Sequence, residues 1–146
     1  MAVVEHIIER GPAREVAAAL LNSAALPSAD LTGAHMEHFF YCGNASSPRG
    51  LVGLEFCGSV ALLRSLVVAV GHRSAGIGAQ LLMHAEQYAR ATDARSIYLL
   101  TTAAEAFFAH RGYVAAARES APAEIRNTRE FADICPASAT LMVKHL

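Results

Sequence analysis

The sequence predicts an α/β fold in which helices pack on a central mixed sheet. Apolar runs of strand length alternate with segments whose apolar residues recur at helical spacing, giving the order β-α-(α)-β-β-β-α-β-α-β-α-β. A buried strand also leads through a glycine loop into an amphipathic helix, within VVAVGHRSAGIGAQLL at residues 67–82. The sequence contains no internal repeat, linker or low-complexity tract, so we expect one domain over residues 1–146.

The first half of the chain predicts one or two helices and then an antiparallel meander. We expect a first strand over 2–9, and Gly11-Pro12 then begins a helix that reaches residue 22. Residues 31–37 fit either a short helix or an irregular loop. Turns rich in Gly, Ser, Asn and Pro separate three further strands, which we expect over 38–42, 51–56 and 60–68.

The second half alternates helices with strands. The helix after the glycine loop runs from Gly76 to about Ala91, and a strand follows over 96–101. Thr102 and Glu105 have the spacing of a capping box, which predicts a helix that ends at Gly112. The remaining elements are expected to be a strand over 113–118, a polar helix over 122–134 and a strand over 139–144.

Composition and charge exclude several function classes. The net charge of −1 argues against nucleic acid or an anionic membrane as the main partner. No apolar run reaches the length of a membrane span, and the first residues lack the pattern of an export signal. The three scattered cysteines, Cys42, Cys57 and Cys135, show no ligand spacing, so we expect reduced thiols, a cytoplasmic protein and no metal site.

The glycine loop predicts a phosphate site. A strand, a glycine turn and a helix in that order direct unpaired N–H groups and the positive end of the helix dipole at one point. The lysine of a Walker loop is missing after Gly76-Ile77-Gly78. The third glycine of the dinucleotide fingerprint is also missing, because Leu81 stands there.

The residues from Arg73 to Gly78 closely resemble the Arg/Gln-x-x-Gly-x-Gly/Ala signature of the GNAT acetyltransferases. The preceding LVVAVGHR also resembles the family pattern, except that Val70 stands where the family usually has proline. The segment EAFFAHRGY resembles the second family hallmark, and the resemblance covers essentially the whole chain. It implies the GNAT fold, a mixed, mostly antiparallel sheet whose strands splay apart where acetyl-CoA binds.

More narrowly, LLRSLVV, YLLTTAAEAFFAHRGY and APAEIRNTREFADICPASA resemble the small acetyltransferases of arsenic-resistance operons. This resemblance implies a role in resistance to arsenic or another toxic metabolite. A related group acetylates the amino group of arsenic- or phosphorus-containing amino acids.

The family resemblance also implies the contacts to the coenzyme. The N–H of Val68 is expected to polarise the acetyl carbonyl. Arg73 contacts the pyrophosphate either through its charged side chain or only through its backbone. Thr102 either bonds the substrate or coenzyme or only caps the following helix. The full expected set is Leu66, Val67 and Val68 at the pantetheine, Arg73, Ser74, Ala75, Gly76, Ile77 and Gly78 at the pyrophosphate, and Thr102, Phe107 and Phe108 nearby.

The implied reaction is direct attack of an amine on the thioester, which needs a base because amines are mostly protonated near neutral pH. Glu55, a carboxylate in an apolar strand, is our first candidate, and an outward-facing surface position is its alternative. Phe108 stands where many GNAT enzymes have the tyrosine that protonates the leaving thiolate. A thiolate can depart without such an acid, since a thiol pKa is only about 8.5.

Arg64 is our candidate for binding an anionic acceptor. It shares the face of Leu62 and Leu66, and a buried arginine needs an anionic partner. If no internal carboxylate pairs with it, a substrate carboxylate, phosphinate or arsenate-like group fits; pairing with Glu55 is the alternative. His38 lies in the segment that covers the acceptor site in GNAT folds, with a surface position as its alternative.

These residues predict an enzyme that acetylates the primary amine of a small, anionic, amino-acid-like molecule. Two other functions fit the sequence: acetylation of a protein or peptide amine, and acyl-CoA sensing without catalysis. A homodimer is common in the family that this chain resembles.

Overall fold

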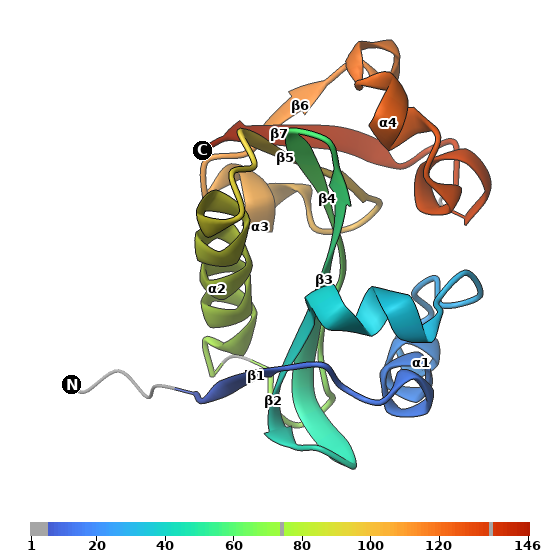
Figure 1. The fold of residues 1–146 in the computed structure, drawn as a ribbon. Coiled ribbons are helices and arrows are strands. Elements are labelled where there is room, and N and C mark those ends of the chain that lie inside the picture. Colours follow the sequence, from blue (N-terminus) through green and yellow to red (C-terminus); the bar gives the residue numbers. More distant parts are fainter. Residues whose placement is uncertain (1–5, 74, 135) are drawn as a thin grey trace.

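The structure, a computed structural model, describes residues 6–73, 75–134 and 136–146. Within these residues seven strands form a sheet with the order β1-β2-β3-β4-β5-β7-β6 (Figure 1). The strands are β1 (Ile8–Arg10), β2 (Phe39–Asn44), β3 (Ser47–Cys57), β4 (Val60–Val68), β5 (Ser96–Thr101), β6 (Val114–Ala116) and β7 (Thr140–His145). The helices are α1 (Arg14–Ser23), α2 (Ile77–Ala91), α3 (Glu105–Ala109) and α4 (Ala123–Arg126), with 3₁₀ turns η1 (Gly33–His38) and η2 (Arg118–Ser120) and a π-helical turn η3 (Glu130–Ile134).

The parallel pair in the sheet is β4–β5, and every other neighbouring pair is antiparallel. The ladder between β4 and β5 ends at Leu62 and Tyr98, although β4 continues to Val68 and β5 to Thr101. The two strands therefore part over the second half of β4. A mixed, mostly antiparallel sheet with strands splayed at this point is what the sequence predicts, and the fold class is confirmed.

A β-bulge lies at the start of this splay. Between the pairs Gly53–Arg64 and Leu51–Val67, β4 advances by one residue more than β3 does. Ser65 has a φ of 62°, which is uncommon for a non-glycine residue and places it in the bulge. The bulge bends β4 and changes the direction of its edge as it leaves β5.

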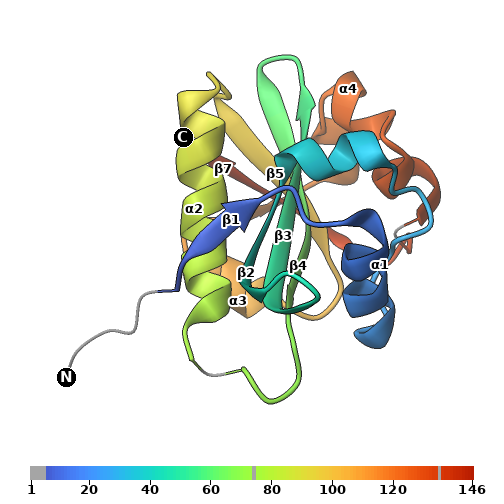
Figure 2. The ribbon, with the colours of Figure 1, turned by 60° about the horizontal axis from the view of Figure 1, so that its bottom comes forward.

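Helices cover both faces of the sheet (Figures 1 and 2). On one face α2 packs Leu81, Leu82 and Ala85 against strand residues such as Val52 and Ile97. On the other face α1 and α4 form two smaller clusters, one around Leu21 and one around Ile125. The alternation of side chains along the strands explains the division, because Leu62 and Leu63 belong to clusters on opposite faces.

The N-terminal turn of α2 lies close to the sheet because Gly50 on β3 has no side chain. A Cβ there would lie 2.8 Å from both Ile77 Cγ2 and Leu81 Cδ1, closer than Cβ atoms ever come to other heavy atoms. The apolar residues at helical spacing in α2 can therefore reach the core from the first turn onward.

Two predicted helices differ from the structure, one at its N-terminal end and the other in its interior. The capping box at Thr102 is wrong: α3 begins at Glu105, and Oγ1 of Thr101 accepts the Ala104 N–H at 3.0 Å. In the segment 31–37, for which the sequence allowed a short helix or an irregular loop, the 3₁₀ turn η1 forms over Gly33–His38. The first strand is shorter than expected, and the part of that prediction over residues 1–5 lies outside the described residues.

The continuous helix predicted over 122–134 is also wrong. Helix α4 ends at Arg126, and the π-helical turn η3 starts only at Glu130. Thr128 accounts for the interruption, because its hydroxyl donates to the Ile125 carbonyl at 2.7 Å and accepts the Phe131 N–H at 3.3 Å. In an unbroken helix Glu130 would lie roughly 140° around the axis from Ile125. In the structure both residues are buried.

No helix in the described part of the chain is both long and apolar enough to cross a lipid bilayer.

Candidate active site

A cavity of about 490 Å³ lies where β4 and β5 part. Its walls come from both faces of the sheet, so it passes between the two strands. From β4, β5 and the helix α3 they include residues 63–66, 99–104, 107 and 108, and from the α1 and α4 side residues 25–27, 130, 136 and 139. Of the described residues that line it, two are acidic or basic: Arg64 and Glu130.

The glycine loop lies beside this cavity. Gly76 precedes α2 with a φ of 78°, in the left-handed region, and a Cβ there would meet no described atom within 4 Å. A Cβ on Gly78 would lie 3.6 Å from Val68 Cγ2 and 3.7 Å from Phe107 Cζ, so the first turn of α2 adjoins the splayed strand and the cavity. The first N–H groups of a helix have no intrahelical acceptor, so those at the start of α2 are available to a ligand.

The free edge of β4 turns toward this space. The Ala69 N–H donates to the Arg49 carbonyl at 2.8 Å, on the β3 side. Because backbone groups alternate along a strand, the N–H groups of Val68 and Leu66 point to the β5 side, where the ladder has ended. Nε of Arg73 donates to the Val68 carbonyl at 3.3 Å, so this side chain folds back toward β4.

The helix α3 supplies the aromatic wall of the cavity. Phe108 is 5% exposed and makes edge contacts with Phe107 and Tyr113, at centroid distances of 5.1 and 5.6 Å. The Arg111 guanidinium lies 3.8 Å from the centre of the Phe107 ring. Thr102 is exposed and lines the cavity.

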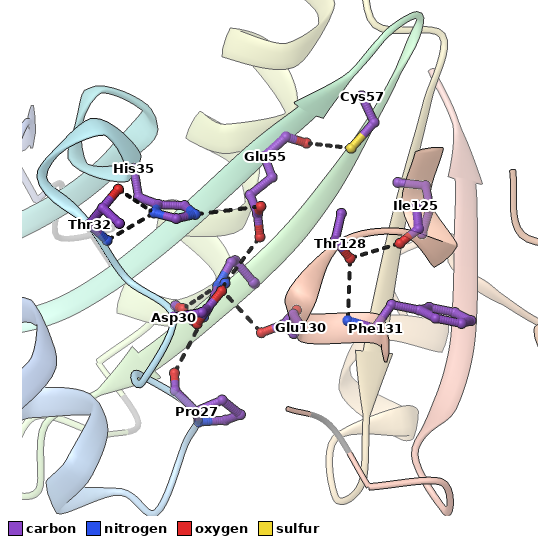
Figure 3. A network of polar contacts seen from close by, with 12 residues as sticks. Pro27, Asp30, Thr32, His35, Glu55, Cys57, Ile125, Thr128, Glu130 and Phe131 are labelled. Atoms are coloured by element: carbon purple, nitrogen blue, oxygen red, sulfur yellow. Dashed lines mark hydrogen bonds and ion pairs between the residues drawn. The ribbon is translucent and has the colours of Figure 1, made fainter. Parts of the chain in front are cut away.

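A buried cluster of charged groups, here called the Arg64 cluster, lies on the α1 and α4 side (Figure 3). Its members are Asp30, Glu55, Arg64 and Glu130. The Arg64 side chain is fully buried, and Asp30 binds both of its Nη atoms, with Oδ1 2.9 Å from Nη2. Glu55 Oε2 lies 3.0 Å from Nη1, and Glu130 Oε1 lies 3.4 Å from Nε. Three carboxylates thus share one guanidinium.

The pKa values of the cluster follow from burial and from distance to Arg64. Burial alone would raise the pKa of Asp30, but hydrogen bonds and charge from Arg64 outweigh it and hold that pKa below its usual range. Burial raises the pKa of Glu130 to about 7, against the opposing effect of Arg64, and the charges of Glu55 and Asp30 add to the rise. Of Asp30 and Glu130, the residue with the longer contact to Arg64 is therefore the one whose pKa is raised.

The profile of the acetyltransferase (GNAT) family matches residues 4–113. This chain belongs to the acetyltransferase (GNAT) family. No curated protein sequence gives a significant match.

Solved structures of GNAT and related proteins share the fold. N-acetylglutamate synthase from Neisseria gonorrhoeae, complexed with coenzyme A and N-acetyl-glutamate, matches with a TM-score of 0.82 at 20% identity, over 98% of this chain and 35% of the synthase. Rv2747 from Mycobacterium tuberculosis, in complex with CoA, matches with a TM-score of 0.76 at 17% identity, over 96% of this chain and 99% of Rv2747. An acetyltransferase from Streptococcus agalactiae gives 0.67 at 16% identity, over 96% and 98% of the two chains. The chain thus spans about a third of the synthase but the full length of the other two.

Two observations indicate that this site suits coenzyme A. The left-handed Gly76 leaves open space in front of the α2 amides, where a side chain would otherwise project. The parted strands also leave the second half of β4 without a β5 partner, beside a cavity of about 490 Å³. Of the predicted residues, four line the cavity: Leu66, Thr102, Phe107 and Phe108. Gly78 adjoins Val68 and Phe107, Arg73 contacts Val68, and the side chain of Val67 packs toward α1 instead. Ser74 lies outside the described residues.

The predicted acceptor residues of this GNAT chain are only partly brought together. Arg64 lines the cavity, but its guanidinium binds internal carboxylates, including Glu55, the alternative left open by the sequence. Glu55 is half-buried between Arg64 and His35, whose Nε2 lies 3.6 Å away. His38 instead lies against Phe56 and Tyr88, with Nδ1 3.2 Å from the Tyr88 hydroxyl, and is not among the described lining residues.

Three described residues are close enough to hold a metal ion together. Ligand atoms of Asp30, His35 and Glu55 lie within 4.8 Å of one another, and both carboxylates also contact the Arg64 guanidinium. Burial raises the pKa of Cys57 to about 11, so it is a neutral thiol. Cys42 is buried and not in a disulfide, and Cys135 lies outside the described residues.

Proposed function

We propose that this GNAT chain transfers the acetyl group of acetyl-CoA to the primary amine of a small molecule. The observation that carries the proposal is the cavity between the parted β4 and β5, which adjoins the open N-terminus of α2 at one end and a buried carboxylate at the other. One space therefore has a phosphate-binding end and an end that can receive an amine.

On the donor side, the N–H groups at residues 75–78 would hold the pyrophosphate with help from the α2 dipole. The pantetheine would bond the free edge at residues 66–68, flanked by Phe107 and Phe108. The Val68 N–H then points at the thioester carbonyl and stabilises the negative charge that develops on its oxygen. Thr102 is exposed at the cavity wall and is available to a ligand, since Thr101 makes the local backbone bond.

The sulfur leaves without help from a tyrosine. Phe108 lines the cavity and has no hydroxyl to donate. Because a thiol has a pKa of about 8.5, the thiolate is a good leaving group near neutral pH and takes its proton from water.

We further propose that the acceptor is amino-acid-like and anionic. Two observations support this: the similar synthase structure contains N-acetyl-glutamate, and Arg64 lines the cavity, although three carboxylates already contact its guanidinium. An acceptor acid group would share Arg64 with three carboxylates, most easily at Nε, where the Glu130 contact is the longest. The resemblance to arsenic-resistance acetyltransferases extends the candidates to arsenic and phosphinic amino acids.

A thiol-release assay with a paired panel tests the proposal. Each amino acid, including phosphinic and arsenic analogues, is assayed beside the amine that lacks its acid group. Acetylation of the acids but not their partners would support an anionic acceptor, and the reverse would refute it. Acetylation of peptide amines alone would favour a protein acceptor. Calorimetric binding of acetyl-CoA without turnover on any amine would favour an acyl-CoA sensor.

A further inference from the structure

Glu130 is a carboxylate for which the proposed reaction, as derived so far, has no use. It is 4% exposed, yet it lines the cavity. It comes from the turn η3, which exists because Thr128 interrupts the expected helix. A buried carboxylate that faces a substrate cavity costs free energy unless it is paired or protonated, so it needs either a structural partner or a chemical role.

Pairing accounts for Asp30 and Glu55 better than for Glu130. Asp30 takes both Nη atoms of Arg64, and Glu55 takes Nη1 at 3.0 Å. Nε of Arg64 donates to the Ser65 hydroxyl at 3.1 Å and has Glu130 Oε1 at 3.4 Å. Glu130 thus has the weakest hold on the guanidinium.

The position of Glu130 also differs from that of Glu55. Glu55 is bound by Arg64 and His35 and is not among the described lining residues. Glu130 lines the cavity from η3, and Phe107 and Phe108 of α3 line it as well. An amine that enters from the α1 and α4 side would meet Glu130 on its way to the thioester.

We propose that Glu130, rather than Glu55, is the general base that deprotonates the acceptor amine. This inference rests on the proposed function. The ammonium transfers a proton to the Glu130 carboxylate, and the nitrogen lone pair adds to the thioester carbon. The C–N bond forms and the C–S bond breaks, with its electron pair leaving on sulfur. The nitrogen loses its second proton, the thiolate gains one, and the sum releases one proton to solvent.

The charges around Glu130 suit this role. Arg64 lowers its pKa, whereas Asp30 and Glu55 raise it, and together with burial these set it to about 7. A base with that pKa is ionised for part of the time at neutral pH and still accepts a proton readily. Arg64 and Ser65 act as positioning residues. The Ser65 hydroxyl accepts a hydrogen bond from Nε of Arg64, and the same nitrogen contacts Glu130.

The test compares Glu130→Gln with Glu124→Gln, an exposed glutamate on α4. With an amine that the wild type acetylates, Glu130→Gln should lower kcat/KM by roughly 10²-fold or more, with unchanged calorimetric affinity for acetyl-CoA. Glu130→Asp should recover part of the loss, and Glu124→Gln should equal wild type. The wild-type kcat/KM should fall on the acid side with a pKa near 7, and this limb should vanish in Glu130→Gln.

Several outcomes would overturn the proposal. Glu130→Gln within about threefold of wild type, with its acid limb intact, removes Glu130 as base, while amine acetylation itself stands. The same loss in Glu55→Gln with none in Glu130→Gln assigns the role to Glu55. If Glu130→Gln does not fold, a flat wild-type profile between pH 6 and 8 still refutes the assignment. A wild type that binds acetyl-CoA but acetylates no amine overturns the proposed function and this inference with it.

Discussion

Replacing Arg64 with methionine tests whether this residue serves the fold or the substrate. The side chain is fully buried and contacts Asp30, Glu55 and Glu130. Methionine keeps most of the apolar stem but leaves the buried Asp30 and Glu130 and the half-buried Glu55 without the guanidinium. Breaking a buried ion pair from one side costs roughly 3–5 kcal/mol. For a chain of this size that corresponds to a fall in Tm of roughly 6–20 °C.

The pH dependence of this loss gives a second signature. In the wild type Arg64 depresses the pKa of Asp30, so the stabilisation is present above the usual carboxylate pKa and is lost as pH falls through the depressed value. Without Arg64, burial leaves the pKa values of Asp30 and Glu130 raised, and these two groups destabilise the fold where they are ionised. The deficit of Arg64→Met should therefore be largest at neutral pH and shrink as the pH falls toward 5.

Urea unfolding at pH 7 and pH 5 measures both effects, with Arg95→Met at an exposed position as the matched control. The control should stay within about 0.5 kcal/mol of wild type. An Arg64→Met protein as stable as wild type, with only a raised acceptor KM, would refute the structural role and leave acceptor binding as the role of Arg64.

Three further predictions follow from the site. Gly76→Glu should abolish calorimetric binding of acetyl-CoA while circular dichroism stays unchanged, because it adds a side chain and a negative charge to the open space before α2; unchanged affinity would exclude the phosphate site. Phe108→Tyr should change kcat by less than about threefold, since the thiolate needs no acid, and a large rise in kcat would show that proton donation limits the wild type. Glu130→Gln should become more stable relative to wild type as the pH rises from 5 to 8. The raised pKa of Glu130 stabilises the wild type at low pH, and that contribution is lost as pH rises through about 7. A difference in unfolding free energy that is the same at the two pH values would contradict this.

The elements that the sequence predicts well are those with strong periodicity. The strands over 60–68 and 96–101 match β4 and β5, and the long helix after the glycine loop matches α2 within a residue. Their apolar patterns and the glycine loop are local signals, so local reasoning suffices for the fold and for the coenzyme end of the site.

The acceptor end depends on contacts between distant parts of the chain. Asp30 lies 34 residues before Arg64 in the sequence, and nothing in its own neighbourhood marks it as a partner of Arg64. The burial of Glu130 was not predicted, because helical periodicity places this residue away from the buried Ile125. The interruption of the helix at Thr128 changes that placement. Such a hydroxyl–backbone competition is a weak local signal, but Thr128 inside a predicted helix was a cue that the helix ends early. The homodimer and the cytoplasmic location stay predictions.

A crystal structure with bound coenzyme A tests the central claim most directly. The account predicts the pyrophosphate against the main-chain amides at the start of α2 and the pantetheine between β4 and β5, along the edge at residues 66–68. Coenzyme bound elsewhere, or β4 and β5 paired along their full length, would contradict it.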